Sequence, residues 1–71
     1  MLFRSLERLR AWRGEQARSQ SVPAYVIFHD ATLLAIAAAH PRHLEDLSTI
    51  HGIGAKKLER YGPQLLALMH D

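Results

Sequence analysis

The chain has no cysteine, only three prolines and a single tryptophan among its 71 residues. Without cysteine no disulfide framework is possible, and the common cysteine-containing zinc sites are absent. No apolar run approaches the roughly 18 residues that a membrane span needs, and the amino terminus lacks a signal-peptide pattern. We therefore expect a cytoplasmic domain that depends on an efficient hydrophobic core, because a chain this short buries only about 60–65% of its surface on folding.

Residue patterns that carry catalysis or bind metals are missing as well. His40 and His43 are close in sequence, but Pro41 between them keeps them off one regular helix face. The sequence has no His-Glu-x-x-His spacing, no nucleophile elbow and no Walker phosphate loop. We therefore expect a non-catalytic domain without a metal site or a cofactor. No metal-binding role is therefore expected for the five histidines, which are His29, His40, His43, His51 and His70.

The net charge of +2 is too small to indicate a nucleic-acid partner, but the charges are unevenly distributed. Residues 1–20 carry five arginines against two glutamates, residues 21–50 have a net charge of −2, and residues 51–71 have +1. A basic patch requires the two ends of the sequence to meet in space. The simpler interpretation of the arginines is a solvated helix face.

Apolar residues at three- and four-residue steps predict a first helix from Leu2 to about Arg18. Arg13 lies in the same arc as this apolar stripe, so it either belongs to a structural ion pair, which we favour, or marks a bend near Gly14. Trp12 lies at the edge of the stripe and is expected to cover the core. The stripe itself consists of Leu2, Phe3, Leu6 and Leu9.

The segment from Tyr25 to Phe28 has the composition of a strand, but the chain offers no second strand to pair with it. It follows an irregular link that ends at Pro23, and we interpret it as a buried turn or a distorted helical segment. Tyr25 then either fills the core or presents its ring at the surface.

The middle of the chain predicts two helices. Asp30 is a good N-cap for a helix over residues 31–40, which Pro41 ends. Five alanines in that helix permit close approach by its neighbours. A shorter helix is expected over residues 43–49.

Glycine and proline divide the last third of the chain. Gly52 and Gly54 surround one apolar residue and predict a tight turn between two short helices. A helix over residues 55–60 follows; we expect Gly62 to end it and Pro63 to begin a last helix at its first position. The whole chain is thus predicted to be all-α, a compact bundle of about five short helices.

The Gly52–Gly54 turn also resembles the helix-hairpin-helix element, which grips a nucleic-acid phosphate. Such a turn leaves backbone N–H groups free at the start of the next helix, where the helix dipole favours an anion. Lys56 and Lys57 follow directly. We expect the two glycines to serve the turn first and phosphate contact second, and simple solvation is the alternative role for Lys57.

Taken in order, these signals resemble the HRDC domain, the "helicase and RNase D C-terminal" module, and most closely those of bacterial RecQ-type DNA helicases. The similarity extends over almost the entire chain, so residues 1–71 are interpreted as one domain of a larger helicase. It rests on Leu6, Leu9, Trp12, Arg13, the run from Pro23 to Phe28, Asp30 to Leu33, Ile36, Ala37, Pro41, Leu47, Ile50, Gly52 to Gly54, and Lys57 to Gly62.

The resemblance implies a monomeric, non-catalytic module that adds weak, structure-sensitive contacts to single-stranded or branched DNA beside the helicase core of the same chain. It further implies a cytoplasmic, nucleoid-associated bacterial protein that acts in DNA repair and recombination, with no membrane partner. In RecQ relatives the contacts cluster around a tyrosine that follows a proline-containing turn and around nearby basic residues. The candidate nucleic-acid-binding residues here are Tyr25, Gly52, Gly54, Lys56, Lys57 and Arg60.

Two alternatives remain open. Glu45 and Asp46 precede the glycine turn, and their negative charges would repel a phosphate backbone. Some members of the family act through protein contacts instead. The domain would then be a regulatory or protein-interaction module that packs on the helicase core or on a partner. An RNA-side role, as in RNase D, is the third hypothesis.

Overall fold

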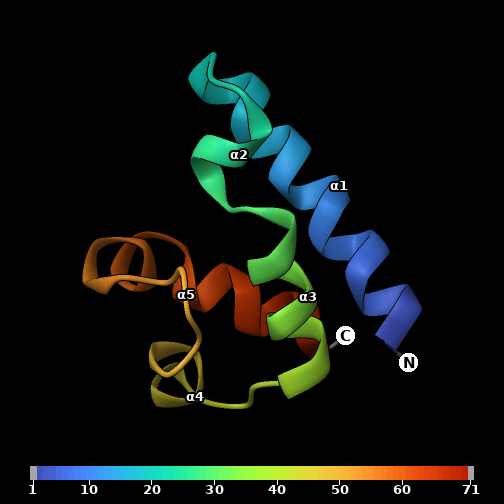
Figure 1. Cartoon of the computed structure of the whole chain (residues 1–71), viewed down its shortest axis with the longest axis vertical. Helices are drawn as coiled ribbons and strands as arrows, with labels where there is room; N and C mark the ends of the chain where they lie inside the picture. Colours follow the sequence, from blue (N-terminus) through green and yellow to red (C-terminus); the bar gives the residue numbers. More distant parts are fainter. Residues whose placement is uncertain (1, 71) are drawn as a thin grey trace.

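The computed structural model describes residues 2–70, in which five α-helices and no strand are found (Figure 1). Helix α1 packs against α2, α3 and α5, whereas α4 packs against α5. The predicted all-α bundle of about five helices is confirmed. Met1 and Asp71, the limits of the predicted domain, lie outside the described residues. The helices are α1 (Leu2–Gln20), α2 (Ala24–Ile27), α3 (Asp30–Ala39), α4 (Leu44–Ser48) and α5 (Ala55–Met69).

Helix α1 runs without interruption through Gly14 and ends two residues later than predicted. Ser21 adopts a left-handed conformation with φ 56°. Its N–H donates to the carbonyl of Arg18 at 3.2 Å, and the N–H of Val22 donates to the carbonyl of Ala17 at 3.0 Å. These two bonds form a Schellman motif, which satisfies the last carbonyls of the helix, with serine at the position where glycine is most common.

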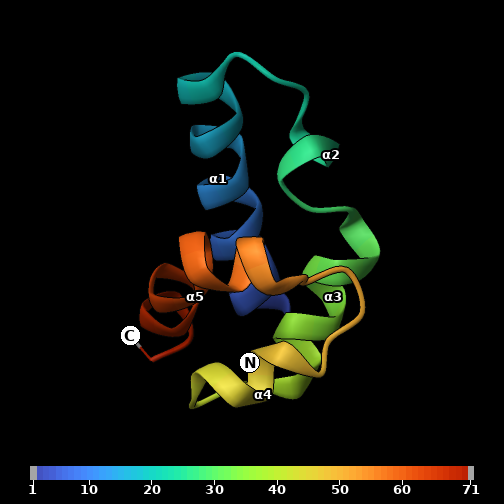
Figure 2. The same cartoon turned by 90° about the vertical axis from the view of Figure 1, so that its left-hand side faces the viewer.

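Helix α2 is a single turn, so of the two predicted alternatives, a buried turn and a distorted helical segment, the structure has the helical one, and a strand is excluded. Ile27 and the following Phe28 are each 1% exposed, whereas Tyr25 and Val26 are 60% and 44% exposed. The turn therefore fixes two apolar side chains in the core and places two others at the surface. Figure 2 shows α2 beside the second half of α1 and above α3.

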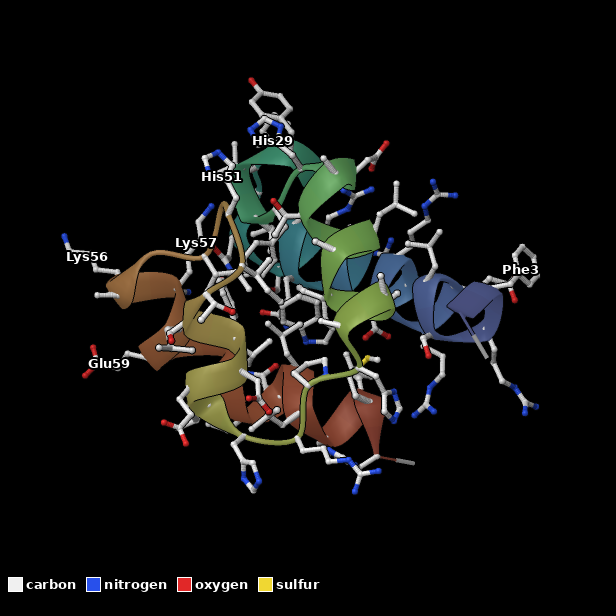
Figure 3. All side chains as sticks on the ribbon, turned by 60° about the horizontal axis from the view of Figure 1, so that its bottom comes forward. Phe3, His29, His51, Lys56, Lys57 and Glu59 are labelled. Carbon is white, nitrogen blue, oxygen red and sulfur yellow. The ribbon has the colours of Figure 1, made fainter. Side chains whose placement is uncertain are left out.

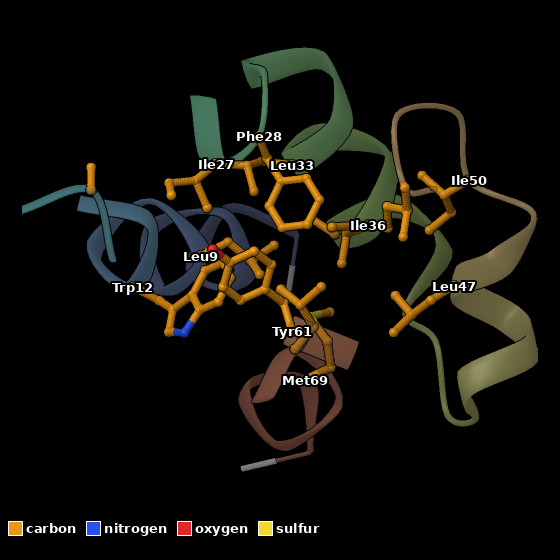
Figure 4. Packing of buried hydrophobic residues seen from close by; sticks show 14 residues of the cluster. Leu9, Trp12, Ile27, Phe28, Leu33, Ile36, Leu47, Ile50, Tyr61 and Met69 are labelled. Carbon is orange, nitrogen blue, oxygen red and sulfur yellow. The ribbon is translucent and has the colours of Figure 1, made fainter. Parts of the chain in front are cut away.

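The hydrophobic core contains an aromatic cluster, with Trp12 covering it as predicted (Figure 4). The Trp12 ring lies edge-on to Tyr61, with ring centroids 5.3 Å apart, and 6.1 Å from Phe28. Its indole N–H donates to Gln64 Oε1 at 2.9 Å, so that its one polar atom is satisfied. The remaining buried apolar residues are Leu9, Ala17, Ile27, Leu33, Ile36, Ala37, Leu47, Ile50, Ile53, Leu65 and Met69.

Arg13 forms the structural ion pair that the sequence predicts. Its Nη2 atom lies 2.8 Å from Asp30 Oδ1, and its Nη1 donates to the carbonyl of Phe28 at 2.9 Å. This pair overturns the capping role predicted for Asp30, because the carboxylate is turned towards Arg13. The residue is the first of α3, His29 is the N-cap, and no side chain caps the helix. Arg13 thus joins α1 to the junction of α2 and α3.

The predicted break between residues 60 and 63 is wrong, because α5 is one helix with Pro63 inside it. Gly62 is buried and serves packing instead of ending the helix: a Cβ atom there would lie 2.6 Å from Leu44 Cδ2 of α4. Tyr61, Leu65 and Met69 are buried at four-residue steps. Burial of this apolar face on both sides of Pro63 holds the helix together despite the missing N–H.

Candidate functional site

The junction between α2 and α3 presents two aromatic rings to solvent. Tyr25 is 60% exposed, which decides between the core and surface positions that the sequence left open. The ring of His29, four residues later, stacks beside it, with centroids 6.1 Å apart and an angle of 25° between the planes. This spacing lies within the range of offset-stacked pairs. The rings extend from a rigid turn, because the neighbouring Ile27 and Phe28 are buried.

The glycine turn between α4 and α5 packs against the start of α3. Gly52 has φ +99°, a conformation that side chains disfavour, and a Cβ atom there would lie 2.2 Å from Thr32 Oγ1. The same hydroxyl donates to the carbonyl of His51 at 3.2 Å. Gly52 is therefore required by the turn and by its contact with Thr32, as expected.

Gly54 differs from Gly52. It is the N-cap of α5 with φ −84°, which any residue adopts, and a Cβ atom there would meet nothing within 4 Å. The fold does not require glycine at this position. The first turn of α5 contains no acidic side chain, and its first N–H groups have no partner within the helix. The backbone at Gly54 is thus open to an approaching anion.

Two of the predicted cations lie over aromatic rings of the core. Lys57 Nζ is 5.2 Å from the centroid of the Phe28 ring, and Arg60 Cζ is 5.4 Å from the centroid of the Tyr61 ring. Cation–π contacts of this kind hold a charge in a defined position at the surface. Lys57 is half-buried and not simply solvated, whereas Arg60 is exposed.

Three of the six predicted residues lie around the junction of α2 and α3. Lys57 contacts Phe28, the neighbour of His29, and the glycine turn contacts α3, so Tyr25, Gly52 and Lys57 surround the junction of α2 and α3. Figure 3 shows His29, His51 and Lys57 on the same side of the molecule. Lys56 is exposed and extends outward from α5 in this view.

Two carboxylates of the acidic middle, those of Asp30 and Asp46, are engaged by neighbouring groups. The hydrogen bond and the positive charge of Arg13 lower the pKa of Asp30 from its usual value of 3.8. Backbone N–H groups of Arg42 and His43 donate to Asp46 Oδ2 at 3.0 and 3.1 Å and lower the pKa of Asp46. Asp46 therefore caps the start of α4, at the opposite end of that helix from the glycine turn.

Within residues 2–70, no three histidine, aspartate or glutamate side chains gather closely enough to hold a metal ion. None of the described helices combines the length and the apolar character that crossing a membrane requires.

The sequence suggested no role for His29 and His51 other than metal binding. His29 lies just after α2, and the extended backbone of Phe28 and His29 brings its ring beside Tyr25. This proximity depends on the turn after α2, which the spacing in the sequence does not predict. The position of His51 depends on the tertiary contact between the glycine turn and α3, which no local pattern records.

A family model described as the HRDC domain matches residues 3–69 of the chain. Among solved structures, the chain is similar to D. radiodurans RecQ HRDC domain 3, with a TM-score of 0.88 and 38% sequence identity, over 93% of this chain and 87% of that one.

Curated relatives are much longer proteins. The chain is 50% identical over 64 residues to the ATP-dependent DNA helicase UvrD2 of Mycobacterium tuberculosis, covering 90% of this chain and 9% of that protein. It is 38% identical over 64 residues to the ATP-dependent DNA helicase RecQ of Haemophilus influenzae, with 90% and 10% covered. The chain therefore spans about a tenth of the length of these relatives.

Proposed function

Since this chain belongs to the HRDC domain family, as its sequence predicted, we propose that it is an auxiliary nucleic-acid-binding domain of a DNA helicase. It contributes weak, structure-sensitive contacts to single-stranded or branched DNA and modulates the activity of the helicase core in the same chain. The parent is then an ATP-dependent DNA helicase of the RecQ or UvrD2 type, and the domain itself is monomeric, non-catalytic and free of cofactors. The relatives are named as such helicases.

The exposed ring of Tyr25 is the observation that carries this proposal. A large side chain that is 60% exposed on a rigid turn contributes little to folding, since its neighbours supply the burial. Stacking of one base on such a ring contributes about 1–3 kcal/mol and tolerates any sequence. The ring is therefore suited to bind unpaired bases, which expose their faces, in preference to the stacked bases of a duplex.

The cations around the ring supply attraction for phosphates. Lys57 lies over the ring of Phe28, three residues after Tyr25, and Arg60 follows one turn later on α5 over the ring of Tyr61. Lys56 points outward and is expected to contribute least. With so few cations, the affinity should be at or below the weak end of non-specific binding, on the order of 10⁻⁴ M at physiological salt.

The glycine turn provides a third element of the proposed surface. Gly52 shapes the turn, and Gly54 leaves the first N–H groups of α5 open to a phosphate oxygen. Two of the acidic groups are engaged within the domain: Asp30 is paired with Arg13, and Asp46 caps α4.

Fluorescence anisotropy at low salt tests the proposal. The 71-residue chain is titrated into labelled single-stranded, forked and duplex DNA. Binding to single-stranded or forked DNA is expected to weaken by about tenfold or more in Tyr25→Ala, because one base loses its stacking partner. The matched control is Phe3→Ala, since Phe3 is also an exposed aromatic, at 72%, but lies at the start of α1, across the molecule from Lys57 in Figure 3. Absence of binding at high protein concentration refutes the proposal.

A regulatory protein-interaction module is the second candidate function. It is favoured by exposed apolar side chains outside the predicted site residues, Phe3 at 72% and Leu34 at 46%. Deleting the domain from its parent separates the two candidates: a purely regulatory domain changes unwinding or ATPase activity while the isolated domain does not bind DNA. A comparison of matched RNA and DNA strands addresses an RNA-side role.

A further inference from the structure

We infer that the ring of His29 is a second stacking residue beside Tyr25, so that two neighbouring bases of a single strand have a ring each; the inference rests on the proposed function. The two rings lie at the junction of α2 and α3, and both residues are exposed. Their planes are only 25° apart. Successive bases of a bound strand stack on aromatic side chains arranged in this way at a protein surface.

The distance between the two rings leaves room for bases. Aromatic carbons in contact lie about 3.5 Å apart, whereas the ring centroids of Tyr25 and His29 are 6.1 Å apart. For ring planes in contact, this distance corresponds to a sideways displacement of about 5 Å, as in an offset-stacked pair. Neither ring therefore covers the other fully, and each keeps open area for a base.

The backbone fixes the position of His29 without the help of its side chain. The carbonyl of His29 accepts hydrogen bonds from the N–H groups of Thr32 and Leu33, at 3.0 and 3.2 Å. His29 is the N-cap of α3, but its side chain makes no capping hydrogen bond. The preceding residue, Phe28, is 1% exposed. The imidazole thus extends from a fixed backbone and is not needed to cap the helix.

Stacking on His29 does not require a charge on the ring. An ordinary imidazole is neutral at pH 8 and is aromatic in that form. Attraction of phosphates is left to cations such as Lys57, which lies over the ring of Phe28. A cation that neutralises a phosphate of a single strand adds about 0.7 to the slope of log affinity against log salt, whereas a neutral ring adds nothing to it. The salt slope therefore separates a stacking role of His29 from a charge contact.

His29→Ala is expected to weaken the binding of single-stranded DNA about fivefold at pH 8. This change corresponds to about 1 kcal/mol, the lower end of the range for one base stacked on an aromatic side chain, because the imidazole ring is small. His29→Phe keeps a ring and should bind as the wild type does. His29→Gln keeps a polar side chain without a ring and should bind as weakly as His29→Ala.

The test is fluorescence anisotropy of the 71-residue chain with labelled oligo-dT at pH 8 and low salt, followed by a salt series. Wild type, the three His29 variants and Tyr25→Ala are compared. The matched control is His43→Ala, since His43 is also an exposed histidine but lies at the start of α4, at the far end of that helix from the glycine turn. Circular dichroism melts verify that each variant is folded.

The inference is supported if His29→Ala and His29→Gln weaken binding with an unchanged salt slope, while His29→Phe and His43→Ala bind as the wild type does. It is refuted if His29→Ala binds as tightly as the wild type, if the phenylalanine variant is as weak as the alanine variant, or if the salt slope falls in His29→Ala. In each of these cases, weaker binding by Tyr25→Ala leaves the proposed function standing. Absence of binding by the wild type refutes the proposed function as well.

Discussion

Gly52→Ala tests whether the glycine turn is held in place by packing against α3. Gly52 has φ +99°, and an added Cβ atom would lie 2.2 Å from Thr32 Oγ1 and 3.3 Å from two carbons of the same side chain. The left-handed side of φ costs an L-residue roughly 1–2 kcal/mol. Thr32 must also move, which breaks its hydrogen bond to the carbonyl of His51, worth about 1 kcal/mol.

Together these terms predict that the variant loses about 2–3 kcal/mol of unfolding free energy. For a domain of 71 residues, 1 kcal/mol shifts the melting temperature by about 4–8 °C, so a fall of roughly 10–20 °C is expected. Thermal melts and urea titrations followed by circular dichroism measure this loss. Gly54→Ala is the matched control, because Gly54 has an ordinary φ and open space around it; it should cost no more than about 1 kcal/mol.

A double-mutant cycle with Thr32→Ala isolates the contact. Removal of the threonine hydroxyl should destabilise the wild-type chain by about 1 kcal/mol, since Thr32 is buried. In the Gly52→Ala background the same change relieves the clash, so it should cost less or even stabilise. The reasoning is refuted if Gly52→Ala is as mild as Gly54→Ala, or if the effects of the two substitutions simply add.

Three further predictions concern α1, the acid stability and the cations. Gly14→Ala should raise the free energy of unfolding by about 0.5–1 kcal/mol, since an added methyl group meets only one arginine nitrogen, at 3.5 Å. A thermal melt should show a higher melting temperature, and a lower one would contradict this. Because the pKa of Asp30 is lowered, its pairing with Arg13 stabilises the fold above about pH 3.8, and this contribution is lost as the pH falls through the lowered value. Asp30→Asn should therefore weaken the loss of unfolding free energy at acidic pH. If the stability of the variant falls with acidification as steeply as that of the wild type, the pair contributes nothing. Lys57→Ala should reduce the salt slope of single-strand binding by about 0.7 and Lys56→Ala by less, and the opposite order would exclude the proposed surface.

The fold was predictable wherever a local pattern had one physical meaning. The apolar stripe of α1 and the position of Arg13 within it indicated the ion pair, because a guanidinium on a buried arc needs a partner. The prediction failed where one residue type serves two purposes. Gly62 and Pro63 have the signature of a helix end followed by a helix start, yet the glycine provides room for Leu44 and the proline lies inside α5.

The candidate surface was less predictable than the fold. Tyr25 is equally compatible with a core and a surface position, and only the burial of its neighbours Ile27 and Phe28 places it outside. The contact between Lys57 and Phe28 joins residues 29 positions apart, and the link between Thr32 and His51 joins residues 19 positions apart. Such contacts follow from how helices pack, which the periodicity of a single helix does not record.

The continuity of α5 has a mechanical consequence. The helix begins beside the open backbone at Gly54, carries Lys57 and Arg60 in its first two turns, and ends at Met69, which is buried in the core. At 1.5 Å per residue it is a rod of about 22 Å. If single-stranded DNA binds to the first turns of α5, as proposed, tension on the DNA is transmitted along this one helix to the core contacts of Tyr61 and Leu65.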